Sequence, residues 1–210
     1  MFKEKLLSNI PFAATKDQER AIDVISQFIF DKNIPIFILK GYAGTGKTTI
    51  MAALVKTLPL FKINTVLLAP TGRAAKVLSL YSDKNAFTIH KRIYFSHHED
   101  NEFSFKLKDN KSKDTIFIVD EASMIGIKQD NMFTASNLLD DLMQYVKNGI
   151  NCKITFIGDK AQLPPVGEVV SPALDEDFME RHFSFRPLSY QLTEVVRQAL
   201  DSGILRNASN

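Results

Sequence analysis

The stretch Gly41-Tyr-Ala-Gly-Thr-Gly-Lys47-Thr48 decides the fold of this chain, because it fits the pattern G-x-x-x-x-G-K-[ST] of a phosphate-binding loop. The apolar run Ile34–Leu39 before it is long enough for one buried strand, and residues 48–58 after it have helical apolar spacing. Strand, glycine turn and helix form the context that this motif requires. A glycine-rich loop that only turns the chain is the weaker alternative.

The chemistry of the loop predicts that it binds the phosphates of a nucleotide together with Mg²⁺. Its glycines let backbone N–H groups converge on the β- and γ-phosphates at a helix N-terminus. Lys47 adds a full positive charge, and the hydroxyl of Thr48 is placed to bind Mg²⁺. The residues expected to contact the nucleotide are Gly41, Ala43, Gly44, Thr45, Gly46, Lys47, Thr48 and Thr49.

Composition narrows the class of protein. The 210 residues are 45% hydrophobic, which is enough for one substantial core. A net charge of +2 excludes a globally basic nucleic-acid binder, so any contact with a polyanion must come from a local patch. A single cysteine, Cys152, excludes an internal disulfide and favours a reducing compartment. With no apolar run of about 18 residues, we expect a soluble, cytoplasmic protein without a membrane partner.

Further apolar runs predict a parallel sheet covered by helices on both faces. The expected strands are 34–39, 64–69, 115–119, 152–157 and, less clearly, 188–192. Asp120 and Glu121 follow one of these strands, and Gln162 lies just beyond another. Ligands bind at the carboxyl edge of such a sheet. There Asp120 could hold Mg²⁺, and Glu121 could orient and deprotonate an attacking water.

The remaining segments predict helices and one projection. Residues 15–30 have helical spacing, and Thr15 with Gln18 forms a capping box, the role that spacing alone favours for Gln18. Residues 132–146 predict another amphipathic helix. Apolar and polar residues alternate in 93–113, which predicts a small β-hairpin insertion. Its lysines could touch a phosphate backbone, although a charged run is usually a solvated face.

The order of the motifs resembles superfamily 1 helicases, and within them the RecD-like branch that includes small phage DNA helicases. The motifs that carry the resemblance are GYAGTGKTT, LLAPTGRAAKVLS, FTIH, IFIVDEASMI, ITFIGDKAQLPPVGE and YQLTEVVRQA. The likeness as a whole runs from about Thr15 to Arg197. The resemblance implies a RecA-like P-loop motor domain that hydrolyses ATP to move along single-stranded DNA, 5′ to 3′ by family habit.

The resemblance also implies roles for single residues. It assigns Gln18 to adenine recognition, which can coexist with capping, and Gln162 to sensing the γ-phosphate. It implies that Lys47 binds phosphate, that Thr48 and Asp120 bind Mg²⁺, and that Glu121 is the catalytic base. It also implies that Arg197 reaches the γ-phosphate. The residues expected to line the DNA path are Pro70, Thr71, Gly72, Thr88 and His90, although His90 by itself reads as a capping or core histidine.

One departure from the family concerns domain organisation. Superfamily 1 helicases have a second RecA-like domain with another arginine, whereas this sequence stops at Asn210. We therefore expect residues 1–210 to be one RecA-like domain that lacks its partner domain. We expect it to be monomeric, to bind ATP and to hydrolyse little ATP alone. The alternatives are an RNA helicase of the same superfamily and a nucleotide switch that is not a motor. A small-molecule kinase fits less well.

Overall fold

The computed structural model describes residues 1–99, 102–127, 137–159, 161–162, 165, 168 and 170–196, with the backbone alone for the strand residues of 96–104. In these residues a six-stranded parallel sheet has the order β3-β2-β6-β7-β1-β8. The strands are β1 (Ile36–Gly41), β2 (Asn64–Ala69), β3 (Ala86–Thr88), β6 (Lys113–Val119), β7 (Ile150–Gly158) and β8 (Leu188–Leu192). The predicted P-loop fold with a RecA-like parallel sheet is thereby confirmed.

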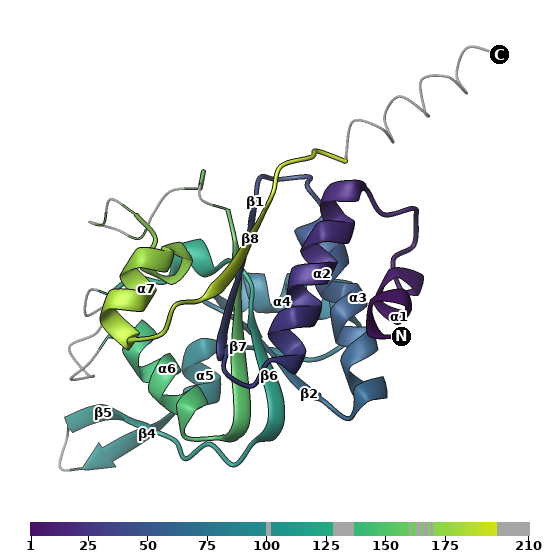
Figure 1. The fold of residues 1–210 in the computed structure, drawn as a ribbon. Helices are drawn as coiled ribbons and strands as arrows, with labels where there is room; N and C mark the ends of the chain where they lie inside the picture. Colours follow the sequence, from purple (N-terminus) through teal and green to yellow (C-terminus); the bar gives the residue numbers. More distant parts are fainter. Residues whose placement is uncertain are drawn as a thin grey trace.

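Helices cover both faces of the sheet (Figure 1). One face carries α1 (Phe2–Ser8), α2 (Lys16–Phe30), α3 (Lys47–Thr57) and α4 (Gly72–Ser82), and the other carries α5 (Ile89–Ile93), α6 (Leu138–Lys147) and α7 (Glu176–Phe183). Side chains alternate along a strand, so Phe37 and Leu39 of β1 join the first core while Ile36 and Ile38 join the second. Burial on both faces explains why the strands read as continuous apolar runs.

The helix boundaries follow local capping signals. The predicted capping box of α2 is present, since Thr15 accepts from the Gln18 N–H and the Gln18 side chain accepts from the Thr15 N–H. α3 passes into a short 3₁₀ helix, Leu58–Phe61. α6 begins at Leu138 behind its cap Asn137, whereas residues 132–136 of the expected helix lie outside the described residues.

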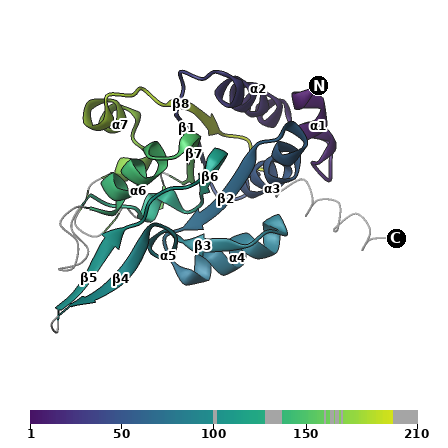
Figure 2. The ribbon, with the colours of Figure 1, turned by 90° about the horizontal axis from the view of Figure 1, so that it is seen from below.

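The predicted hairpin is present but shorter than expected. β4 (Tyr94–Glu99) and β5 (Glu102–Leu107) pair antiparallel and project away from the sheet (Figure 2). At its root the N–H of Lys108 donates to the carbonyl of Ile93 at 2.7 Å. Residues 108–112 then run back to β6, so they belong to a connection and not to the hairpin itself.

The strand order places the motifs at one edge. β7 lies between β1 and β6, so the turns after these three strands are neighbours. The P-loop follows β1, Asp120 follows β6, and Asp159 follows β7. Among the described residues, no helix combines the length and the hydropathy needed to cross a lipid bilayer.

Candidate nucleotide-binding site

The backbone of the P-loop requires glycine at two positions. Gly44 has φ 83° and Gly46 has φ 92°, in the left-handed region that a Cβ disfavours. A Cβ on Gly46 would also lie 2.2 Å from Nε2 of Gln18. The loop can therefore take this path only with glycine at residue 46, where α3 begins.

Gln18 connects the P-loop to the start of α2. Its Nε2 donates to the carbonyl of Thr45 at 3.3 Å, while its Oε1 accepts from the N–H of Thr15 at 3.1 Å. Thr45 is fully buried, and its hydroxyl donates to the carbonyl of Tyr42 at 2.9 Å. Since an amide has two donors and two acceptor positions, one of each is left on Gln18 after these contacts. Gln18 thus caps α2 and supports the loop at once.

Lys47 is held at the mouth of the loop by backbone oxygens. Its Nζ donates to the carbonyls of Gly41 at 2.7 Å and Tyr42 at 2.9 Å. Burial lowers the pKa of Lys47, and three carboxylates act in the opposite direction. These carboxylates belong to Asp159, Asp120 and Glu121. The strand order and these electrostatic influences therefore place one cation and three acids at the same edge of the sheet.

Asp120 and Glu121 take up different positions after β6. The N–H of Asp120 donates to the carbonyl of Leu68 at 3.0 Å, which extends the pairing with β2. Burial raises the pKa of the Asp120 carboxyl despite the nearby Lys47. Glu121 has φ 53° and ψ 38°, a left-handed conformation that costs a non-glycine residue about 1–2 kcal/mol. Such local strain is characteristic of functional positions.

Gln162 is fixed by two residues that sequence reasoning did not identify. Its Oε1 accepts from the hydroxyl of the buried Ser123 at 2.9 Å. Its N–H donates to the carbonyl of Asp159 at 3.2 Å, and the Asp159 carboxylate accepts from the N–H of Ala161 at 2.9 Å. The signal for Asp159 was available, because it follows an apolar strand as Asp120 does. Ser123 gave no comparable signal.

A third missed residue is Asp17, at the start of α2. Its nearly buried carboxylate accepts from the N–H groups of Thr193 at 2.7 Å and Glu194 at 3.1 Å. Burial acts to raise the pKa of Asp17, but these bonds hold it below the ordinary value. The N–H of Val196 in turn donates to the carbonyl of Gly44 at 2.9 Å. The chain leaving β8 is thus tied to both α2 and the P-loop, whereas Arg197 lies outside the described residues.

The residues predicted to line a DNA path lie at the carboxyl ends of the neighbouring strands β2 and β3 and at the starts of α4 and α5. The hydroxyls of Thr71 and Thr88 cap α4 and α5, accepting from the N–H groups of Ala74 and Lys91 at 3.2 Å. His90 is partly buried in α5, with its ring 5.6 Å from that of Tyr94. Pro70 and Gly72 flank Thr71 at the same edge. Thr71 and Thr88 therefore act as helix caps in this fold, and His90 packs against Tyr94.

Comparison with known proteins shows which family the sequence matches. The AAA domain family matches residues 14–210. The ATP-dependent DNA helicase dda of Enterobacteria phage T4 is 30% identical over 192 residues, covering 87% of this chain and 39% of dda. The ATP-dependent RecD2 DNA helicase of Deinococcus radiodurans is 28% identical over 173 residues, covering 82% of this chain and 21% of RecD2.

A solved structure supports the fold. The crystal structure of Pif1 helicase from Candida albicans has a TM-score of 0.55 and 18% sequence identity, covering 93% of this chain and 43% of that chain. The resemblance to superfamily 1 helicases of the RecD-like branch is confirmed by these similarities. The chain spans well under half the length of the curated relatives dda and RecD2.

Proposed function

This chain belongs to the AAA domain family, and on that premise we propose that it is the ATP-hydrolysing motor domain of a DNA helicase. We further propose that the helicase moves along single-stranded DNA in the 5′ to 3′ direction and unwinds duplex. Membership of the family implies nucleotide binding. The relatives that are named as DNA helicases support the choice of motor activity.

The observation that carries the proposal is the convergence of Lys47 with three carboxylates at the carboxyl edge of the sheet. A cation beside strand-end acids is suited to binding a triphosphate and activating water against it. In our proposal Lys47 exchanges the carbonyls of Gly41 and Tyr42 for phosphate oxygens, which needs only a small movement because both carbonyls belong to the loop. Glu121 accepts the proton of the attacking water.

The same site is suited to Mg²⁺. Burial raises the pKa of Asp120, so a cation beside its carboxylate would favour the charged form. The hydroxyl of Thr48 and the carboxylate of Asp120 would hold Mg²⁺, which would neutralise charge on the β- and γ-phosphates. One carboxylate is sufficient, because Mg²⁺ in such sites takes its remaining ligands from phosphate and water.

The other predicted residues receive roles around the phosphates. Gln162, held by Ser123, would report the γ-phosphate, and Arg197 would reach the same group. Gln18 would recognise adenine with the donor and acceptor left after its contacts with Thr15 and Thr45. The nucleotide-contacting residues Gly41, Ala43, Gly44, Thr45, Gly46 and Thr49 would surround the phosphates.

For nucleic acid, we propose that single-stranded DNA crosses the turns after β2 and β3. Support comes from the free backbone donors expected at the start of α4, beside residues 70–72. Thr88 and His90 would continue this path at the neighbouring turn. Phosphate contacts alone do not separate DNA from RNA.

The test is the ATPase rate of the full-length protein with single-stranded DNA, with single-stranded RNA of the same sequence, and without nucleic acid. We expect DNA to stimulate turnover most. Equal rates in all three reactions would contradict the motor, and stronger stimulation and unwinding with RNA would favour the RNA helicase. Glu121→Gln should retain ATP binding and lower turnover about 10²- to 10⁴-fold. If the protein were a nucleotide switch and not a motor, the full-length Glu121→Gln variant would keep its function in cells.

We also propose that the full-length protein is a cytoplasmic monomer with a second RecA-like domain that supplies another arginine to the nucleotide. The second domain is supported by the small share of dda and RecD2 that this chain covers. An arginine supplied to the phosphates is worth roughly 10³–10⁵ in turnover. Residues 1–210 alone should therefore bind ATP but turn it over slowly. Equal turnover by residues 1–210 and by the full-length protein would contradict a contribution from a second domain.

A further inference from the structure

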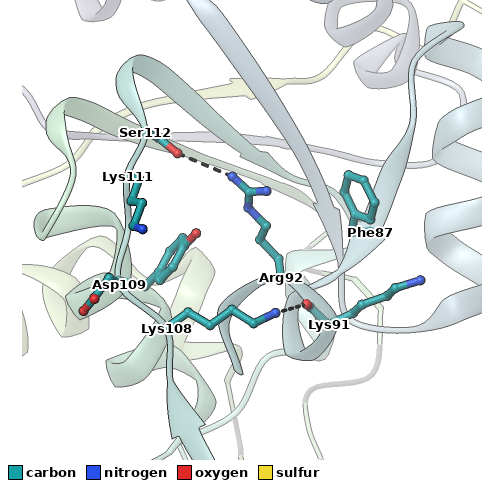
Figure 3. Close-up of a pocket in the computed structure, with 8 residues that line it drawn as sticks. Phe87, Lys91, Arg92, Lys108, Asp109, Lys111 and Ser112 are labelled. Carbon is teal, nitrogen blue, oxygen red and sulfur yellow. Dashed lines mark hydrogen bonds between the residues drawn. The ribbon is translucent and has the colours of Figure 1, made fainter. Parts of the chain in front are cut away.

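An open hollow of about 460 Å³ lies at the root of the hairpin, apart from the nucleotide site (Figure 3). It is formed by the edge strand β3, the short helix α5 and the connection that follows β5. The lining residues are Phe87, Lys91, Arg92, Lys108, Asp109, Lys111, Ser112 and Tyr145. Its volume suits a group of the size of a nucleotide unit.

The lining of the hollow is strongly basic. It contains four cationic side chains and a single carboxylate, that of Asp109, in a chain whose net charge is only +2. Within the described part of the chain, none of the four cations forms an ion pair with a carboxylate. Lys108 instead donates to the carbonyl of Lys91 at 2.9 Å, which brings the two chain segments together. Like charges gathered in this way attract a polyanion.

Arg92 lies at the centre of the hollow with unused hydrogen-bonding capacity (Figure 3). One guanidinium nitrogen, Nη2, makes a long contact of 3.4 Å with the hydroxyl of Ser112. Its Nε is buried and has no hydrogen-bond partner among the described residues. A buried donor without a partner is unfavourable, and a rotation of the side chain that brings Nε and an Nη nitrogen to two oxygens of a phosphate would satisfy it.

Phe87 gives the hollow an aromatic wall on the side opposite Lys111 (Figure 3). Phe87 is 36% exposed although it belongs to a strand. Phe87 directly precedes Thr88, one of the residues proposed above to contact DNA. Exposed aromatic rings beside cations are characteristic of surfaces that bind single strands, where bases stack and phosphates pair with charge.

We propose that this hollow binds the phosphodiester backbone of single-stranded DNA. The strand continues from Thr88 and His90 towards the root of the hairpin. Arg92, Lys91 and Lys111 bind phosphates, and Phe87 stacks on a base. This inference rests on the proposed function, since it extends the path of the same DNA strand.

The first test neutralises the two exposed lysines of the hollow in the full-length protein, as the double variant Lys91→Gln/Lys111→Gln. The matched control is Lys32→Gln/Lys56→Gln, which removes the same charge from exposed positions elsewhere. Fluorescence anisotropy with a labelled single strand gives the dissociation constant at several salt concentrations. The logarithm of the association constant falls linearly with the logarithm of the salt concentration, and each phosphate contact on a single strand contributes about 0.7 to the slope. Loss of two phosphate contacts should therefore make this slope shallower by about 1.4.

The second test replaces Phe87 with Leu, which keeps an apolar side chain but removes the aromatic face. Binding of a normal single strand should weaken about 5- to 150-fold, as expected for one lost stacking contact of about 1–3 kcal/mol. Binding of an abasic strand of the same length should not change. A loss that is equal on both strands would mean that Phe87 acts only on the fold, which would overturn its stacking role.

The two proposals fail differently. If the hollow variant and its control have the same slope, while the parent protein binds DNA and DNA stimulates its ATPase, the inference is wrong and the motor function stands. If the parent protein neither binds DNA nor responds to it, both are wrong.

Discussion

The carboxylate of Asp17 accepts a 2.7 Å hydrogen bond from the hydroxyl of Tyr190, which joins the start of α2 to the edge strand β8. The other carboxylate oxygen accepts from the N–H groups of Thr193 and Glu194, just beyond β8. One side chain therefore determines where the chain goes as it leaves the sheet towards Arg197. Removal of its charge should affect both stability and the site.

Asp17→Asn should lower the free energy of unfolding by about 1.5–3 kcal/mol, because hydrogen bonds to a charged group become bonds to a neutral one. Urea denaturation at neutral pH measures this change. The control is Asp23→Asn on the same helix, whose exposed ion pair with Lys3 should contribute less than about 1 kcal/mol. Equal losses for the two variants would contradict the role assigned to Asp17.

The difference in unfolding free energy between the parent protein and Asp17→Asn should depend on pH in a defined direction. The pKa of Asp17 is lower in the folded protein than its ordinary value of 3.8. The carboxylate therefore stabilises the fold fully above about pH 3.8, and this contribution is lost as the pH falls through the folded-state pKa. The stability difference between the parent protein and Asp17→Asn should be large at neutral pH and shrink in acid. A difference that grows in acid would refute this assignment.

Gly46→Ala should destabilise the protein and weaken ATP binding. Alanine at φ 92° costs about 1–2 kcal/mol, and its Cβ would displace the Gln18 amide from Thr45. The matched control is Gly72→Ala, where a Cβ meets nothing within 4 Å and the residue is already helical. This control should be neutral or stabilise by up to about 1 kcal/mol. Thermal unfolding and binding of a fluorescent ATP analogue test both variants.

Ser123→Ala should reduce turnover more than nucleotide affinity. It removes the hydroxyl that holds Oε1 of Gln162, and a misplaced catalytic side chain costs about 10- to 100-fold in rate. The dissociation constant for ATP should change little, because Ser123 does not belong to the loop. Ser26→Ala, which removes a hydroxyl bonded only within α2, is the control and should leave the steady-state turnover of the full-length protein unchanged.

Lys153→Met should destabilise the fold without touching the nucleotide site. The buried Nζ of Lys153 donates to the carbonyls of Phe28, Ile29 and Asp31 at 2.6, 3.2 and 2.8 Å, where α2 ends. Since the last turn of α2 has no basic residue, this ammonium complements the helix C-terminus. We expect a loss of about 2–3 kcal/mol in urea denaturation. Lys147→Met, at an exposed position, should have little effect.

Features carried by neighbouring residues were predictable from the sequence. The P-loop, the capping box of Thr15 and Gln18, and the acids after β6 all follow from short-range rules of glycine conformation, helix capping and apolar periodicity. The small edge strand β3 was missed because three residues are too few for a periodic signal. The helix boundaries differed by a few residues, since capping and packing together determine where a helix ends.

The supporting contacts of the site could not be predicted in the same way. Asp17 and Thr193 are 176 positions apart, and Ser123 and Gln162 are 39 apart. Such pairs exist only because the parallel strand order places the turns after β6 and β7 side by side and brings β8 next to β1. No local pattern marks a residue whose partner is chosen by the order of strands in a sheet.

By itself, the sequence determined that the chain contains a phosphate-binding loop, which acids stand at strand ends, and which continuous apolar runs form the buried strands. Only the tertiary structure decided that Lys47 shares one edge of the sheet with three carboxylates, that Asp17 holds the chain beyond β8, and that the basic residues at the hairpin root share one hollow. The physical reason is that backbone conformation and hydrophobic periodicity are properties of adjacent residues. Charge convergence and long-range hydrogen bonds instead depend on how the packed sheet brings distant segments together.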